Sequence, residues 1–350
     1  MPKVHNFSAG PAILPQEVID NCAAALKNFS NTGLSLIEVS HRSKEFMSVM
    51  DEAKSLVKKL MKLSDDYEVL YLQGGASTQF LMLAMNLLET KAAYLNTGTW
   101  ASKAIKEAQI LGNVEVLASS KDRNFNYIPK DYLIENSYDY FHCTSNNTIS
   151  GTQMHSFPDC PVPLVCDMSS DIFSRTIDYT KFDLIYAGAQ KNMGPAGTTL
   201  VVIKKDILGK VNRQIPTMLK YDTHISKGSM FNTPSVFAVF GCNETLKWID
   251  YQGLSVIEKL NIEKANMLYN EIDNNDLFIG TVEKEDRSLM NITFLLKDES
   301  LNEQFLAAAT EANISGIKGH RSVGGFRAST YNALEKDSIE ALVNVMQTFK

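Results

Sequence analysis

Apolar positions along the chain follow two spacings, one typical of amphipathic helices and one typical of short buried strands. Recurrence every three or four residues predicts helices over residues 45–61, 79–88, 236–251, 255–271 and 301–311. Apolar runs too short for helices predict strands over residues 68–72, 92–96, 114–118, 138–143, 164–166, 184–186 and 199–203. Short buried strands separated by helices indicate an α/β fold with a mostly parallel sheet flanked by helices.

The pattern changes after residue 251. The long helix over 255–271 is followed by a predicted strand over 290–294, the helix over 301–311 and a glycine-rich segment over 316–325. A chain of 350 residues is also too long for one typical hydrophobic core. We therefore expect a second, smaller α+β domain in the last third of the chain.

Lys191 lies among small residues, in Ala187-Gly188-Ala189-Gln190-Lys191-Asn192-Met193-Gly194-Pro195, just after a predicted strand. A lone lysine is more often a solvated surface charge, but one held among small residues can lose water and attack a carbonyl. Asp167 follows the neighbouring apolar run and precedes Met168-Ser169-Ser170. An acid and a lysine at the ends of adjacent strands are what a pyridoxal phosphate site requires.

Three turns after predicted strands carry further candidate ligand-binding groups. Gln73-Gly74-Gly75-Ala76-Ser77-Thr78 precedes a helix that we expect to begin near residue 79, and such a junction favours a phosphate or a simple helix cap. It matches neither dinucleotide nor nucleoside triphosphate motifs. Trp100 could stack on a planar cofactor or fill the core. The turn Asn147-Thr148-Ile149-Ser150-Gly151 supplies hydroxyl groups.

Cationic side chains gather in two places. His41 and Arg42 precede the helix over 45–61, and His320, Arg321 and Arg327 lie in the glycine-rich tail. Arginine binds carboxylate and phosphate through two parallel hydrogen bonds, so several such residues indicate a substrate with two acidic groups. The alternative is a solvated basic loop.

The composition narrows the class of protein. Forty acidic and 34 basic side chains give a net charge of −6, which argues against nucleic acid as a partner. No apolar run reaches the length of a membrane helix, and the first residues do not resemble a signal peptide. The five cysteines form no C-x-x-C pair, so we expect a cytoplasmic protein without a metal site.

Six short motifs, in order along nearly the whole chain, closely resemble the phosphoserine aminotransferase family of fold-type I pyridoxal phosphate enzymes. They are Asn6-Phe7-Ser8-Ala9-Gly10-Pro11, Gly74-Gly75-Ala76-Ser77, Asp167-Met168-Ser169-Ser170, Gln190-Lys191-Asn192, Asn232-Thr233-Pro234-Ser235 and His320 to Ser329. The resemblance implies a homodimer with a large cofactor domain of residues 15–255. The small domain would consist of residues 1–14 and 256–350.

The resemblance also implies roles for individual residues. Lys191 would be the Schiff-base lysine and Asp167 the acid facing the pyridine nitrogen. The remaining cofactor-binding residues would be Ala76, Ser77, Trp100, Thr148 and Gln190, with Asn232 and Thr233 acting from the neighbouring subunit. Substrate-binding residues would be Ser8, His320, Arg321 and Arg327, with His41 and Arg42 from the neighbouring subunit. Some relatives have an arginine where this chain has Ser77, so one cation of the family pattern is absent.

The reaction implied is transamination between L-glutamate and 3-phosphohydroxypyruvate in serine biosynthesis, with a possible second role on 4-phosphohydroxy-L-threonine in pyridoxine biosynthesis. Two other fold-type I activities remain open, an alanine–glyoxylate transaminase and a cysteine desulfurase, although no cysteine here lies in a desulfurase-like motif. A third alternative, from a different class, is a catalytically silent phosphate-binding protein that uses the turn at 74–78.

Overall fold

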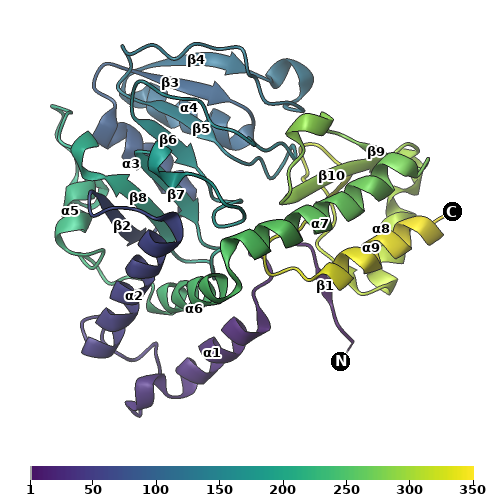
Figure 1. Cartoon of the computed structure of the whole chain (residues 1–350), viewed down its shortest axis with the longest axis horizontal. Coiled ribbons are helices and arrows are strands. Elements are labelled where there is room, and N and C mark those ends of the chain that lie inside the picture. Colours follow the sequence, from purple (N-terminus) through teal and green to yellow (C-terminus); the bar gives the residue numbers. More distant parts are fainter. Residues whose placement is uncertain (1) are drawn as a thin grey trace.

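A seven-stranded sheet forms the centre of the larger part of the molecule (Figure 1). The computed structural model describes residues 2–350. Across the sheet the strands are β2 (Tyr67–Leu72), β8 (Thr199–Lys204), β7 (Leu184–Gly188), β6 (Leu164–Asp167), β5 (Phe141–Thr144), β3 (Lys91–Asn96) and β4 (Asn113–Ser119). β8 runs antiparallel to both of its neighbours, whereas the other described neighbours pair in parallel. The expectation of a mostly parallel sheet is confirmed.

Helices cover both faces of this sheet. Successive strand residues point to opposite sides, and because both sets are apolar here, each face needs a layer that buries it. In β2, Val69 and Tyr71 join one core with α1 (Gln16–Lys27), α2 (Lys44–Met61) and α6 (Val236–Gln252). Leu70 and Leu72 join a second core with α3 (Gly75–Leu87), α4 (Thr99–Leu111) and the short α5 (Tyr221–Ser226). The result is a three-layer arrangement of helix, sheet and helix.

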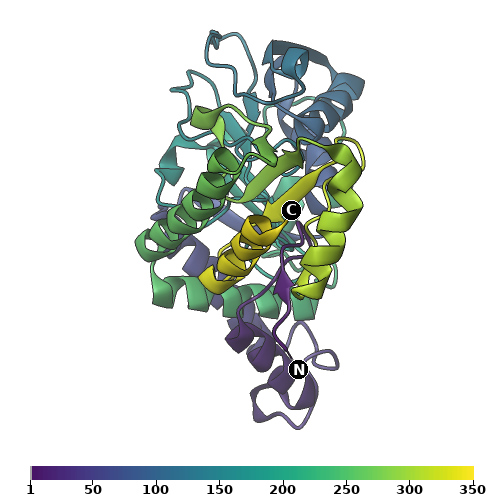
Figure 2. The same ribbon diagram turned by 90° about the vertical axis from the view of Figure 1, so that its right-hand side faces the viewer.

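The C-terminal part of the chain builds a separate core on a three-stranded antiparallel sheet of β9 (Phe278–Gly280), β10 (Asn291–Leu296) and β12 (Phe326–Ser329). Helices α7 (Leu254–Asn274), α8 (Asn302–Glu311) and α9 (Lys336–Thr348) pack on it. The N-terminus joins this part, because β1 (His5–Asn6) pairs in parallel with β11 (Ile314–Ser315) and Phe7 is fully buried in the same core. Figure 2 shows the purple N-terminal strand beside the green and yellow C-terminal elements.

Helix α7 contributes to both parts of the molecule. Ile257, near its start, belongs to the core on one face of the large sheet, whereas Ala265, Leu268 and Ile272 belong to the C-terminal core. The division of the chain at residue 255 stays a prediction.

One predicted strand begins later than its apolar pattern indicates. Residues 138–140 precede β5, and within them the Asp139 carboxylate accepts hydrogen bonds from the backbone N–H groups of Glu89, Thr90 and Lys91. The side chain thereby anchors the turn before β3, and regular pairing starts at Phe141. A pattern of apolar residues cannot predict a hydrogen bond made by a polar side chain.

Candidate active site

Asp167 and Lys191 lie at the same edge of the large sheet. Asp167 is the last residue of β6, and Lys191 follows the end of the adjacent, parallel β7 by three residues. The Asp167 side chain is 5 % exposed, and one of its oxygens accepts a 2.9 Å hydrogen bond from the backbone N–H of Ser169. Lys191 is half-buried. The topology therefore brings the two residues together, as expected from their strand-end positions.

The charges of these two residues act on one another. Burial raises the pKa of the Asp167 carboxyl, and the nearby Lys191 ammonium opposes that rise. Burial also lowers the pKa of the Lys191 amine, while Asp167 raises it and the Arg327 guanidinium lowers it further. The net lowering increases the fraction of neutral amine, the form that can act as a nucleophile or a base.

A chain of contacts runs from Lys191 to the three-stranded sheet. The Lys191 ammonium lies 5.8 Å from the centroid of the Trp100 ring, at the first turn of α4. The Trp100 indole N–H donates a 3.1 Å hydrogen bond to Thr148 Oγ1. The carbonyl oxygen of Thr148 accepts a 2.8 Å bond from Arg327 Nη1, on β12. These contacts connect Lys191 through Trp100 and Thr148 to Arg327.

The turn after β2 differs from its prediction. Helix α3 begins at Gly75, not near residue 79, because Gly74 and Gly75 both take a positive φ, of 96° and 66°, which turns the chain into the helix within two residues. The first helical hydrogen bond runs from the N–H of Thr78 to the carbonyl of Gly74, at 3.4 Å. The N–H groups of Gly75, Ala76 and Ser77 therefore stand at a helix N-terminus, which favours a phosphate.

The N-terminal segment closes one side of the lysine loop. The N–H of Ala12 donates a 2.9 Å bond to the carbonyl of Gln190, and a Cβ added at Gly10 would lie 3.4 Å from Lys191 Cγ. Ser8 is half-buried and packs against Gly316, where the tail segment that carries His320 begins. The segment thus contacts both the lysine loop and the cationic tail.

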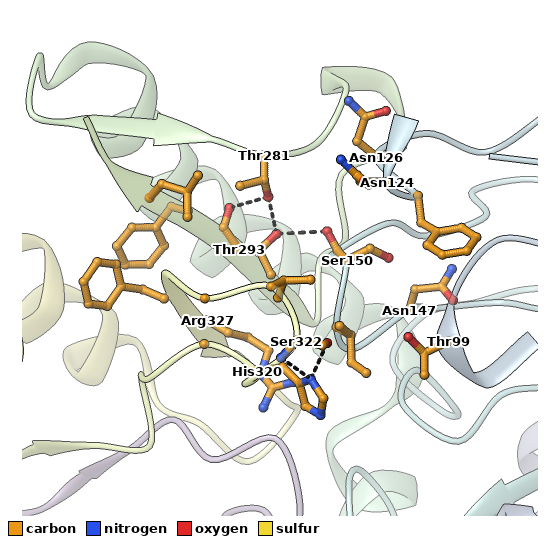
Figure 3. A pocket seen from close by; sticks show the side chains of 18 of the residues that line it. Thr99, Asn124, Asn126, Asn147, Ser150, Thr281, Thr293, His320, Ser322 and Arg327 are labelled. Atoms are coloured by element: carbon orange, nitrogen blue, oxygen red, sulfur yellow. Dashed lines mark hydrogen bonds between the residues drawn. The ribbon is translucent and has the colours of Figure 1, made fainter. Parts of the chain in front are cut away.

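A cavity of about 670 Å³ opens beside Trp100, between the large sheet and the C-terminal unit. Figure 3 shows His320 and Arg327 on one side of it and Thr99 and Asn147 on the other. His320 Nδ1 contacts Ser322 Oγ at 2.7 Å, while Arg321 is exposed. Burial, Arg327 and Arg321 lower the pKa of His320, which favours the neutral ring. Lys191 and Asp167 do not line this cavity; Trp100 and Arg327 connect it to them.

The four residues expected to act from the neighbouring subunit do not line this cavity either. His41 and Arg42 precede α2, where a nitrogen of the His41 ring is buried without a described partner. The Asn232 amide donates a 2.8 Å bond to Gln73, beside the N-terminus of α3, and Thr233 next to it is exposed. The single chain brings Asn232 near the phosphate-favouring turn, whereas His41 and Arg42 are absent from the lining of the cavity that holds His320.

A buried polar cluster behind Asp167 is missing from the sequence-based prediction. The Asp171 carboxylate accepts hydrogen bonds from Ser145, from Gln153 at 3.0 Å and from Arg175 at 3.3 Å. Asp171 is 5 % exposed, and its charge raises the pKa of both Asp167 and Lys191. The sequence did carry a signal for this cluster, because Asp171 is a second acid only four residues after Asp167, in the turn that follows β6.

Residues 2–350 contain neither a membrane-spanning helix nor a metal site. No helix in this range is both long and apolar enough to cross a bilayer. No group of three or more His, Cys, Asp or Glu side chains within it is arranged to hold a metal ion.

Comparison with known proteins gives one consistent family. The family described as aminotransferase class-V matches residues 4–342. The phosphoserine aminotransferases of Parabacteroides distasonis and Flavobacterium psychrophilum are 58% and 59% identical, covering 99% of this chain and 99% and 98% of their own. Phosphoserine aminotransferase from Bacillus circulans subsp. alkalophilus superposes with a TM-score of 0.96 at 45% identity, over 99% of this chain and 98% of that one.

More distant structures share the fold alone. An alanine–glyoxylate aminotransferase from Nostoc superposes with a TM-score of 0.79 at 15% identity, over 99% of this chain and 95% of that one. Sequence identity above 50% is found with phosphoserine aminotransferases, whereas the enzyme from Nostoc shares the fold at only 15% identity. The chain is a member of the class-V aminotransferases and, within them, of the phosphoserine aminotransferases.

Proposed function

We propose that this chain transfers the amino group of L-glutamate to 3-phosphohydroxypyruvate, giving O-phospho-L-serine and 2-oxoglutarate, with pyridoxal 5'-phosphate as its cofactor. The observation that carries the proposal is the juxtaposition of Lys191 and Asp167 at one sheet edge, linked through Trp100 and Thr148 to Arg327. An amine, a buried acid and a carboxylate-binding cation are the groups that this reaction requires.

The residues at this edge fit the proposed cofactor. Helix α3 offers the free N–H groups of Ala76 and Ser77 to its phosphate, and we assign Gln190 to the same group. Asp167 has one oxygen engaged by Ser169, which leaves the other for a ring nitrogen. Trp100 offers an aromatic face held in place by Thr148. Asn232 and Thr233 would complete the phosphate site of the neighbouring subunit in a homodimer.

When bound, the cofactor supplies an aldehyde that links to amines and a ring that withdraws electrons. The Asp167 carboxylate would keep a proton on the ring nitrogen, since an adjacent negative charge favours the protonated form. The Lys191 amine would hold the resting cofactor. Once freed, it would act as the base that removes the Cα proton of the amino donor, and in the second half-reaction as the acid that delivers a proton to Cα of the product. The lowered pKa of Lys191 supports its role as a base.

Substrate recognition follows from the charges around the cavity. Arg327 would bind the α-carboxylate that both substrates share, held in orientation by the carbonyl of Thr148. Ser8, His320 and Arg321, with His41 and Arg42 of the neighbouring subunit, would bind the phosphate or the side-chain carboxylate of glutamate. The same phosphate site would accept 4-phosphohydroxy-L-threonine. The five free thiols support a reducing, cytoplasmic location.

The test is an assay with L-glutamate as amino donor and three acceptors: 3-phosphohydroxypyruvate, hydroxypyruvate and glyoxylate. We expect efficient formation of 2-oxoglutarate only with the phosphorylated acceptor. Preference for glyoxylate would favour the alanine–glyoxylate alternative. Failure to turn over any acceptor, in a protein that binds phosphate but not the cofactor, would favour the silent binding protein.

A further inference from the structure

Lys103 is a cationic residue of α4 that has no role in the reaction proposed above. It lies one helical turn after Trp100, so the two side chains share a face of the helix. Its ammonium lies 4.4 Å from the centroid of the Trp100 ring, and the residue is exposed. In the described part of the chain Lys103 rests on this ring and not on a carboxylate. Its positive charge is therefore available to a ligand.

The neighbouring cavity has the electrostatic character that an anion requires. None of its described lining residues is acidic, although the chain as a whole carries a net charge of −6. Two cations in its lining already have partners: Arg123 forms an ion pair with Glu283, and Arg327 donates a hydrogen bond to the carbonyl of Thr148. His320 and Ser322 line the cavity on the same side as Arg327, and their side chains contact one another (Figure 3).

The charge of Lys103 reaches this side of the cavity. It is one of three cations, with Arg327 and Arg321, that lower the pKa of His320. A group that repels a proton from His320 equally attracts a negative charge placed beside that ring. The contact with Trp100 keeps the flexible lysine stem near the cavity, because a cation over an indole face is itself favourable.

We propose that Lys103 is a specificity-determining residue that binds the phosphate of the phosphorylated substrate, together with His320 and Arg321. This inference rests on the proposed function and names a contact in addition to those of the motifs. A doubly charged phosphate gains more from Lys103 than the single carboxylate of glutamate does. Lys103 thus discriminates between the two substrates, whereas Arg327 serves both.

The experiment compares the wild-type holoenzyme with Lys103→Gln, Lys103→Arg and the control Lys106→Gln. Lys106 is an exposed lysine on the same helix, one turn further from Trp100. Calorimetry gives the affinity for 3-phosphoglycerate, which carries a carboxylate and a phosphate but neither an amine nor a ketone, and for glycerate. Steady-state kinetics give KM for 3-phosphohydroxypyruvate and for glutamate.

We expect Lys103→Gln to weaken 3-phosphoglycerate about 3- to 5-fold at low salt, the size of one exposed ion pair, and the loss to shrink at about 0.5 M salt. KM for 3-phosphohydroxypyruvate should rise by a similar factor and KM for glutamate by less. Lys103→Arg should restore binding, and Lys106→Gln should match the wild type.

Two results would overturn the assignment of Lys103. One is unchanged affinity for 3-phosphoglycerate in Lys103→Gln. The other is an equal loss for 3-phosphoglycerate and glycerate, which would mean that Lys103 only supports the indole of Trp100. Both are distinct from failure of the proposed function, in which the wild type itself would neither bind 3-phosphoglycerate nor use 3-phosphohydroxypyruvate.

Discussion

Arg327 Nη1 donates a 2.8 Å hydrogen bond to the carbonyl oxygen of Thr148, across the junction between the C-terminal sheet and the large sheet. Thr148 is 4 % exposed, and its hydroxyl accepts the indole N–H of Trp100. One residue therefore sets the positions of the proposed carboxylate clamp and of the proposed stacking ring. A change in the orientation of the C-terminal sheet would move Arg327 relative to Thr148 and Lys191, which follow strands of the large sheet.

Replacement of Arg327 tests the clamp. Arg327→Ala should reduce kcat/KM about 10- to 100-fold for glutamate and for 3-phosphohydroxypyruvate alike, because a charge-assisted hydrogen bond to their shared α-carboxylate is lost. The effect should appear mainly as raised KM values in steady-state assays. A loss confined to one of the two substrates would assign the carboxylate to another residue.

Asp167→Asn tests the electrostatic role of the buried acid. The amide keeps the shape of the side chain but removes the negative charge that favours a proton on the ring nitrogen. We expect turnover to fall by several orders of magnitude with the fold intact, as monitored by circular dichroism. Near-normal turnover in this variant would remove Asp167 from the mechanism.

Two glycines at the start of α3 provide a matched test of the phosphate site. Gly74 has φ +96°, and an added Cβ would lie 2.0 Å from Thr78 Oγ1; Gly75 has φ +66° and open space around it. Gly74→Ala should weaken cofactor binding to the apoprotein at least about 10-fold, because it must displace the turn, whereas Gly75→Ala meets only a conformational cost of about 1 kcal/mol. Equal effects in cofactor titrations would argue against the turn as the phosphate site.

Lys264 tests the packing that supports β12. Its side chain is 2 % exposed, and its ammonium donates to the carbonyls of Thr330, Tyr331 and Leu334 at 3.1, 2.8 and 3.0 Å. Lys264→Met should lower the free energy of unfolding by about 1–3 kcal/mol, since buried carbonyls lose their donor. Urea denaturation measures this, with Lys259→Met on the exposed face of α7 as the control. Equal stability of both variants would contradict the account.

The sequence pattern predicted the strands of the large sheet and the positions of Lys191 and Asp167 because both depend on local signals. A buried strand shows as an apolar run, and the carboxyl end of a strand is readable from where that run stops. The turns after predicted strands added Trp100 and Thr148, and the glycine-rich tail added Arg327; the structure connects these three residues by hydrogen bonds.

Features that depend on contacts between distant segments could not be predicted in this way. The buried amide of Asn146 donates to Asn291 at 2.7 Å, across 145 residues of chain, and no spacing encodes that pairing. The early start of α3 depends on the backbone of Gly74, because hydrophobic periodicity is silent where a helix begins with Gly-Ala-Ser. The contact of Lys103 with Trp100 was readable as an i, i+3 pair, but its nearness to His320 was not.

The attachment of the cofactor to one particular lysine is the central claim, and borohydride reduction followed by peptide mass spectrometry tests it most directly. In the wild type, the reduced cofactor should be found on the peptide that contains Lys191, and glutamate added before reduction should prevent the labelling. In Lys191→Ala, no peptide should be labelled and the transaminase activity should be lost. Labelling of a different lysine in the wild type, or an active Lys191→Ala protein, would contradict the account.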